Sequence, residues 1–196
     1  MTRLIACLVL LLGSTGCHLL YKEKFVDPEY DLRDSQLIVV PFRDLDHWYY
    51  EVAEGRELAK FVMVELQREC DLEVVGGAEV ENAVWDNVEE VDWTEVGKSV
   101  EADFVLYGTI RELRNDTRGV VGFLRGTVRV DLSVWDVEKG ELAFERRVQT
   151  IYPEDVESGD IGVTFEQSRA ELRKQLFARA AKKVSATFCG EWVDRY

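Results

Sequence analysis

Basic residues and histidine are scarce in this chain of 196 residues. Lysine and arginine number 24 against 38 aspartates and glutamates, which gives a formal net charge of −14. Electrostatic binding of nucleic acid or of an anionic lipid surface is therefore not expected, because both carry negative charge. His18 and His47 are the only histidines, and no Cys-x-x-Cys spacing occurs. We expect neither a metal site nor a cofactor.

Motifs that carry catalysis are missing as well. No Gly-x-Ser-x-Gly sequence occurs, and neither histidine has an evident nucleophile close to it in the chain. Gly97-Lys98-Ser99 resembles the end of a phosphate-binding loop, but such a loop would need a glycine where this chain has Asp92. We therefore expect no catalytic residues, and we do not expect an enzyme.

The amino terminus carries the features of an export signal. Arg3 precedes the apolar run Leu4–Leu12, and the small residues Gly13–Gly16 follow it and end at Cys17. Nine apolar residues rise only about 14 Å as a helix, against roughly 30 Å of bilayer hydrocarbon. The run is therefore too short to be a permanent membrane span.

This amino terminus resembles the signal of bacterial lipoproteins, whose lipobox ends in the cysteine that receives the lipid. Thr15, Gly16 and Cys17 fit that pattern, whereas Ser14 stands where leucine is usual. The resemblance implies that lipid on Cys17 anchors the protein to a membrane. His18 after the cysteine implies the periplasmic face of the outer membrane. The alternative is an ordinary secretory signal cleaved near Gly16, which would leave Cys17 as a free thiol.

The rest of the chain is long enough for one domain. Removing residues 1–16 as a signal peptide leaves 180 of the 196 residues, and 46% of the chain is hydrophobic. We predict a lipidated cysteine and tether over residues 17–35 and a single globular domain over residues 36–196. Within the tether, residues 18–33 are polar and are expected to be irregular.

Two cysteines remain after Cys7 is assigned to the signal and Cys17 to the lipid. Cys70 and Cys189 each follow a predicted helix, so they could meet at one end of the fold. In an exported protein a disulfide between them would persist, and it would stabilise the fold by on the order of 4 kcal/mol. The sequence leaves open whether Cys70 and Cys189 form a disulfide or remain two separate thiols.

Hydrophobic periodicity predicts a strand, a helix and a second strand at the start of the domain. Gln36–Phe42 is apolar without alternation, which indicates a strand covered on both faces and ended by Pro41. A loop is expected at Arg43–Tyr50, and a helix follows over Glu51–Glu69. Leu72–Val75 is the second strand, for which this order favours parallel pairing.

The second half of the domain predicts three strands and two short helices before a long final helix. The expected elements are helices at Ala78–Trp85 and Trp93–Val100, strands at Glu101–Leu113, Leu124–Val137 and Glu141–Ile151, a turn at Asn115–Gly119, and a helix at Phe165–Phe188 capped by Thr164 and Gln167. The last two strands alternate between apolar and polar residues, which is typical of an antiparallel region with one solvated face. The whole order predicts an α/β fold, in which helices pack over a mixed sheet.

Several of the predicted segments together resemble a known protein domain. They are Leu37–Phe42, Gly55–Ala59, Leu72–Val75, Val96–Ile110 and the following hairpin. They resemble the domain shared by the curli-secretion lipoproteins, the lipoprotein activators of penicillin-binding proteins and the amino-terminal domain of TolB. The resemblance implies a non-catalytic envelope module that contacts another envelope protein, and it leaves oligomers open.

Two stretches are candidates for partner binding. Trp48, Tyr49 and Tyr50 follow the first strand, and such aromatic residues often anchor interfaces, although they could instead staple the next helix to the sheet. Phe123 lies in an apolar stretch that is either exposed or part of a strand. The rival to an interaction module is a periplasmic small-molecule-binding or hydrolytic protein with a pocket lined by these aromatic residues.

Overall fold

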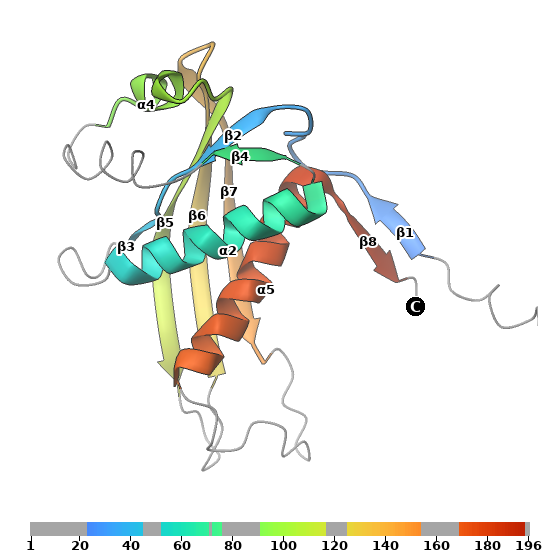
Figure 1. Ribbon diagram of the computed structural model, residues 1–196. Coiled ribbons are helices and arrows are strands. Elements are labelled where there is room, and N and C mark those ends of the chain that lie inside the picture. Colours follow the sequence, from blue (N-terminus) through green and yellow to red (C-terminus); the bar gives the residue numbers. More distant parts are fainter. Residues whose placement is uncertain are drawn as a thin grey trace, which may run out of the picture.

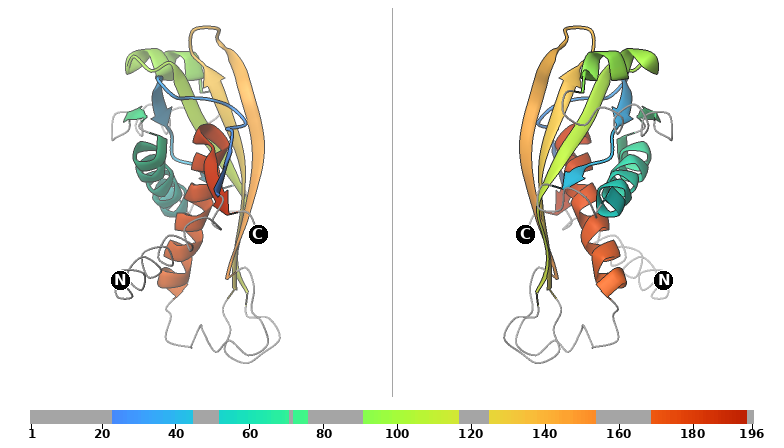
Figure 2. Two further views of the ribbon diagram at one scale, coloured as in Figure 1. Left: turned by 90° about the vertical axis from the view of Figure 1, so that its right-hand side faces the viewer. Right: turned by 90° about the vertical axis from the view of Figure 1, so that its left-hand side faces the viewer.

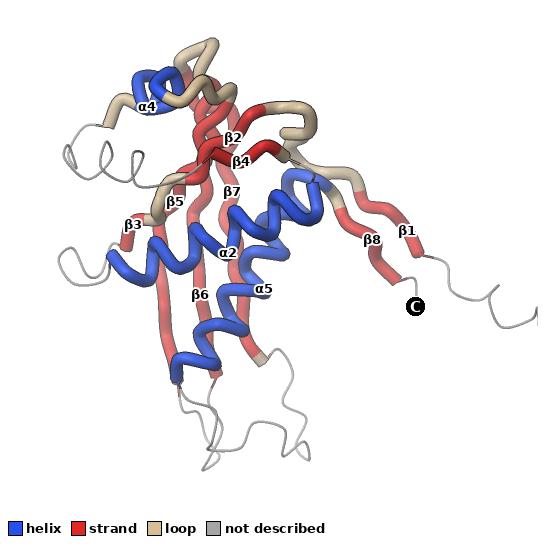
Figure 3. Tube along the Cα trace, in the orientation of Figure 1, coloured by secondary structure: helices blue, strands red, loops and turns tan. Residues whose placement is uncertain are grey.

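The fold is taken from a computed structural model, which describes residues 23–44, 52–70, 72–75, 91–116, 125–153 and 169–194 (Figure 1). The strands are β1 Glu23–Val26, β2 Gln36–Val39, β3 Arg43–Asp44, β4 Glu73–Val75, β5 Phe104–Asp116, β6 Arg125–Asp136, β7 Glu141–Tyr152 and β8 Glu191–Asp194. The helices are α2 Val52–Cys70, α4 Trp93–Ser99 and α5 Arg169–Cys189. Figure 3 shows how the strands and helices alternate along the chain.

The main sheet is mixed, as predicted. Its strand order is β4-β2-β5-β6-β7, and the short β3 also pairs with β5. β2 runs parallel to β4 and β5, whereas β5, β6 and β7 are antiparallel to one another. The predicted α/β fold with a βαβ unit, a three-stranded antiparallel region and a long final helix is confirmed.

One face of the sheet carries the main core. α2 and α5 lie side by side on this face (Figure 2). Buried apolar residues of both helices and of β6 meet there, including Leu58, Val62, Leu66, Val128, Val130, Leu132, Leu176, Phe177 and Val184. The apolar stripe of the final helix therefore covers the sheet, as its spacing predicts.

A second, smaller core explains why apolar and polar residues do not alternate along β2. Leu37 and Val39 face the main core, whereas Ile38 and Val40 belong to a separate cluster under α4. Successive residues of a strand point to opposite faces, so both faces of β2 are covered. The strand is apolar throughout because it has no solvated side.

Pro41 interrupts the pairing of this segment but does not end it. The Val40 amide still donates to the Leu106 carbonyl at 2.9 Å, and pairing with β5 resumes at β3. The prediction of a loop from Arg43 is therefore wrong for its first two residues. Proline cannot donate a ladder hydrogen bond, but the residues after it can.

The segment before β2 contains one strand, β1, and residues 27–35 form no helix or strand. β1 pairs with β8 as a two-stranded antiparallel ribbon, and Leu32 is buried in the main core. Tyr30 stacks on Phe144 with ring centroids 5.2 Å apart. The prediction of an irregular segment is wrong for Glu23–Val26, because the strand that pairs with them lies more than a hundred residues away in the chain. The predicted turn at Asn115 is also wrong for its first two residues, which belong to β5.

Other predicted features lie outside the described residues. They are the helix at Ala78–Trp85, the caps Thr164 and Gln167, and the first residues of the final helix.

Replacing Gly55 with alanine is predicted to destabilise the protein. A Cβ atom at Gly55 would lie 1.8 Å from the carbonyl oxygen of Phe42, which is backbone and cannot move aside cheaply. Overpacking of this kind costs about 2 kcal/mol, and we expect that loss in the free energy of unfolding by urea. The control is Lys60→Ala, an exposed position on the same helix, which should change stability little. Equal stability of Gly55→Ala and the wild type would contradict the proposed contact.

Candidate functional site

Most residues that the sequence marks as functional lie outside the described part of the chain. These are Cys17, Trp48, Tyr49, Tyr50 and Phe123. Their roles in lipid attachment and partner binding stay predictions. The two remaining candidates, Cys70 and Cys189, are described, and they lie together.

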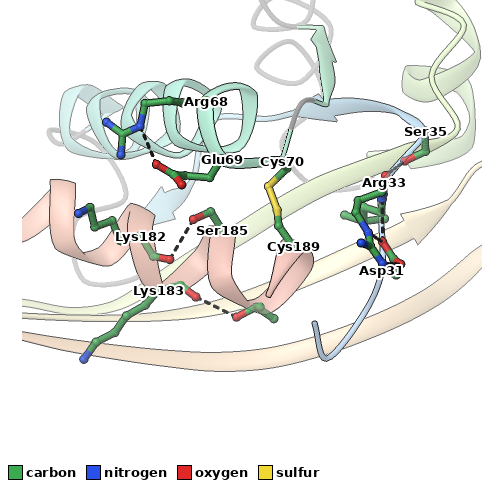
Figure 4. The surroundings of a disulfide bond; sticks show 12 residues. Asp31, Arg33, Ser35, Arg68, Glu69, Cys70, Lys182, Lys183, Ser185 and Cys189 are labelled. Carbon is green, nitrogen blue, oxygen red and sulfur yellow. Dashed lines mark hydrogen bonds and ion pairs between the residues drawn. A yellow bond between two sulfur atoms is a disulfide. The ribbon is translucent and has the colours of Figure 1, made fainter. Parts of the chain in front are cut away.

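Cys70 and Cys189 are joined by a disulfide, with Cα atoms 5.3 Å apart (Figure 4). Each is the last residue of its helix, α2 and α5 respectively. Both side chains are buried against the main core. The bridge therefore ties the two helices together at the end where each of them stops.

The ribbon of β1 and β8 begins next to this bridge. Gly190 follows Cys189 with φ of +73°, a conformation that favours glycine, and the chain turns there into β8. A Cβ at Gly190 would lie 2.3 Å from the carbonyl oxygen of Val26, so β1 packs directly on the turn. The ribbon then runs away from the sheet (Figure 1). Val26, the last residue of β1, therefore lies at the disulfide end of the helices, and Glu23 lies at the far end of the ribbon opposite Asp194.

A second feature lies on the other side of the sheet, on β5, β6 and β7. α2 and α5 cover only one face of these strands, and no helix of the described residues covers the lower part of the opposite, outer face (Figure 2). Alternation on β6 directs Arg129 and Asp131 to this outer face, between the buried residues Val128, Val130 and Leu132. The predicted solvated face is therefore present, and it is rich in charge.

Two carboxylates on this outer face each hold two arginines. Asp131 accepts from Arg111 Nε and from Arg147 Nε, each at 2.6 Å. Glu112 lies 3.1 Å from Arg114 Nε and 3.1 Å from Arg129 Nη1. The arginines come from all three strands, so cross-strand register brings the two clusters together.

These ion pairs shift the titration of Asp131. The pKa of its carboxyl group lies below the ordinary value because Arg147 donates to it, although partial burial works against the shift. Arg111 lowers the same pKa further through a second hydrogen bond and its charge. Asp131 in turn raises the pKa of Arg147. Asp131 and Arg147 therefore both stay charged at neutral pH.

Sequence reasoning missed this network. The alternation of apolar and polar residues along β6 places Arg129 and Asp131 on one side of the strand, and this pattern can be read from the sequence. It does not reveal that Asp131 lies opposite Thr109 and Arg147 on the neighbouring strands. A register shift between Ile110 and Glu112 adds Arg111 to the same cluster.

The upper end of the outer face is covered by α4. The Trp93 ring stacks on Tyr107 with centroids 4.4 Å apart, and Trp135 Nε1 donates to Thr94 Oγ1 at 3.0 Å. Asp92 caps the helix by accepting from two backbone amides of its first turn. The exposed charged surface therefore starts below these aromatic residues.

The rival hypothesis predicts a pocket lined by aromatic residues. Two hollows on the described part of the chain bear on it. One, of about 300 Å³, is lined by Lys98, Ala102, Asp103, Phe104, Asp136, Val137 and Glu138. The other, of about 350 Å³, lies between β7, α5 and the chain after β1 and is lined by Val26, Asp27, Glu29, Arg146, Arg147, Val148, Gln149, Lys183, Ala186, Thr187 and Glu191. Phe104 is the one aromatic residue among these linings.

Two further findings concern only the described ranges. No group of three or more histidine, cysteine, aspartate or glutamate side chains is arranged to hold a metal ion there. None of the helices in those ranges has both the length and the apolar character needed to cross a membrane.

Comparison with known proteins finds similar structures but no similar sequences. No protein-family model and no curated protein sequence matches this chain. PelC from Paraburkholderia phytofirmans, solved as a dodecamer, has a TM-score of 0.49 and 17% identity over 84% of this chain and 97% of its own. Lipoprotein GNA1162 from Neisseria meningitidis has a TM-score of 0.49 and 15% identity over 77% of this chain and 98% of its own.

TolB from Acinetobacter baumannii is also among the similar structures. It has a TM-score of 0.41 and 12% identity, over 85% of this chain and 30% of the TolB chain. The sequence predicts a resemblance to the group that includes TolB, and this TolB structure is one of the similar folds. At identities this low the likeness concerns the fold alone.

Removing the disulfide is predicted to lower stability strongly. The bridge joins residues 119 positions apart, and in the loop-entropy model a closed loop of this size contributes roughly 4 to 5 kcal/mol. The double variant Cys70→Ser/Cys189→Ser should lose about this much free energy of unfolding in guanidinium chloride. Reductant should destabilise the wild type and leave the double variant unchanged. Free alkylation of both thiols in the denatured, non-reduced protein would show that no bridge exists.

The Asp131 network predicts a specific pH dependence. The carboxyl pKa is lowered in the folded protein, so the stabilisation is complete above the ordinary pKa of 3.8 and is lost as the pH falls through the lower, folded value. Asp131→Asn should have a lower free energy of unfolding than the wild type at pH 7. This difference in free energy between the two proteins should become smaller below pH 3.8. Gln149→Ala, a neutral neighbour, should show a difference that does not change with pH. A constant difference for Asp131→Asn would rule out the network as its cause.

Proposed function

We propose that this protein is a lipid-anchored lipoprotein of the cell envelope that acts as a non-catalytic protein-interaction or assembly module. The observation that carries the proposal is the export signal that ends at Cys17. Lipid on this cysteine anchors the chain to the membrane, and His18 directs it to the periplasmic face of the outer membrane. The partner is another protein of the envelope.

The disulfide supports an exported location. Disulfides persist in oxidising compartments such as the periplasm and are rare in the cytosol. The Cys70–Cys189 bridge lies within the main core and joins its two long helices. A buried structural bridge of this kind fits a protein that folds after export.

The position of β1 limits how far the body can lie from the bilayer. Glu23, the first residue of β1, follows Cys17 by six positions. An extended chain spans at most about 3.6 Å per residue, so β1 begins within about 22 Å of the anchored cysteine. The anchor segment is then residues 17–22 and is shorter than the tether that the sequence predicts. The module works close to the membrane surface.

Replacing Cys17 with alanine tests the proposal. Cys17→Ala should abolish incorporation of labelled palmitate and should move the protein from the membrane fraction to the soluble fraction, because no acyl chain remains to hold it. Cys7→Ala is the matched control, since this cysteine lies in the same signal ten residues earlier. It should leave both measurements unchanged.

Cells that express the wild type or Cys17→Ala also test whether the protein binds a partner. After crosslinking in cells, wild-type protein solubilised in detergent should carry a stoichiometric envelope protein, and the Cys17→Ala protein should carry less of it. Unchanged acylation and membrane fractionation of Cys17→Ala would refute the anchor. Absence of any crosslinked partner, together with turnover of a small substrate, would refute the interaction role.

A further inference from the structure

The exposed lower part of the outer sheet face carries a surplus of positive charge. We use the name arginine face for the surface formed by Arg111, Arg114, Arg129 and Arg147 with Glu112 and Asp131. Four guanidinium groups against these two carboxylates leave a formal charge of +2, which the exposed Glu145 at the border of the face reduces to +1, on a chain whose total is −14. This surface therefore has the opposite sign to the protein as a whole.

The arginines of this face are held in place but are not saturated. Each is paired with one carboxylate, and their side chains are still 38% to 66% exposed. A guanidinium group has five N–H donors, and the contacts to Glu112 and Asp131 use one or two of them per arginine. Within the described ranges, the remaining donors have no other carboxylate partner and can bind further carboxylates. Because the side chains are already ordered, a ligand would lose little extra conformational entropy on binding.

A purely structural ladder does not account for this charge ratio. Cross-strand ion pairs stabilise a sheet when opposite charges balance, and like charges on neighbouring positions are destabilising. Here two arginines surround each carboxylate, so each cluster keeps an uncompensated positive charge. A bound anionic group would supply the missing negative charge.

We propose that the arginine face docks an acidic segment of a partner protein. The inference rests on the proposed function, because it names a surface and a partner chemistry for the interaction module. Carboxylates of the partner accept hydrogen bonds from the free guanidinium N–H groups, a geometry that arginine favours. The aromatic pair Trp93 and Tyr107 borders the docking surface at its upper end.

A protein segment fits this surface better than an anionic bilayer does. The arginine face is three strands wide, and the protein around it is strongly negative. A charged bilayer extends far beyond the face and would be repelled by the rest of the molecule. A short acidic segment contacts the face alone, and salt screens more distant repulsion beyond about 8 Å under physiological conditions.

The test uses deca-glutamate, labelled with a fluorophore, and the acylated full-length protein in a non-ionic detergent. Fluorescence anisotropy at about 0.1 M salt, where charges beyond about 10 Å are screened, should show binding that weakens as more salt is added. Arg114→Gln/Arg147→Gln removes two exposed charges and leaves each carboxylate one arginine partner. We expect its affinity for deca-glutamate to fall about tenfold.

Two further double variants distinguish the loss of charge on the arginine face from a general effect of the substitutions on folding. Arg33→Gln/Arg68→Gln removes two arginines that are also about half exposed and paired with carboxylates, but that lie elsewhere on the molecule. It should bind deca-glutamate like the wild type. Arg114→Lys/Arg147→Lys keeps the charge and should retain most of the affinity. Thermal unfolding of every variant checks that the fold persists.

Several outcomes would overturn the docking proposal. They are no binding of deca-glutamate at about 0.1 M salt, an equal loss in the two glutamine variants, and binding of phosphatidylglycerol vesicles in place of the peptide through the same arginines. Each of these results leaves the Cys17 experiment unaffected, so failure of the docking surface is distinguishable from failure of the envelope role.

Discussion

The packing of α2 and α5 against a single face of the sheet is the constraint on which the other features depend. α5 packs over β6 and β7, α2 packs on α5 and over β2, β3 and β4, and Leu66 and Phe177 are inaccessible to solvent in this core. Because the helices stop at the same end of the layer, Cys70 and Cys189 come within reach of each other. Because both helices lie on one side, the lower part of β5, β6 and β7 keeps a polar outer face. One packing arrangement thus decides both the covalent link and the exposed surface.

This arrangement separates the ribbon, which follows the proposed anchor in the chain, from the charged surface. The chain that follows Cys17 enters the described structure through β1, in the ribbon that extends to one side of the sheet (Figure 1). The arginine face lies on the long strands, where β5 ends and β6 begins. A module held near a bilayer through the ribbon would therefore keep a different surface free for another protein. The Cys70–Cys189 bridge links the ribbon end to the helices that support those strands.

Local patterns were sufficient for most of the fold. The apolar run before Pro41, the spacing of apolar residues in α2 and α5, and the alternation in β6 each predict an element because they report how that segment is buried. The same reasoning missed β1, β3 and β8. Each is very short, and each exists because of a partner distant in the chain, so no local period marks it. Of the candidate site, the sequence indicated the two cysteines but left their pairing open.

The sequence by itself determined the class of the fold and which face of β6 is polar, because these depend on composition and on periods of two or 3.6 residues, and it predicts an export signal at the amino terminus. Only the tertiary structure decided that Asp131 lies between Arg111 and Arg147, and Glu112 between Arg114 and Arg129. Cross-strand register and the irregularity in β5 between Ile110 and Glu112 set these neighbours. Register depends on how whole strands pair, and a shift of one residue would direct every one of these side chains to the opposite face.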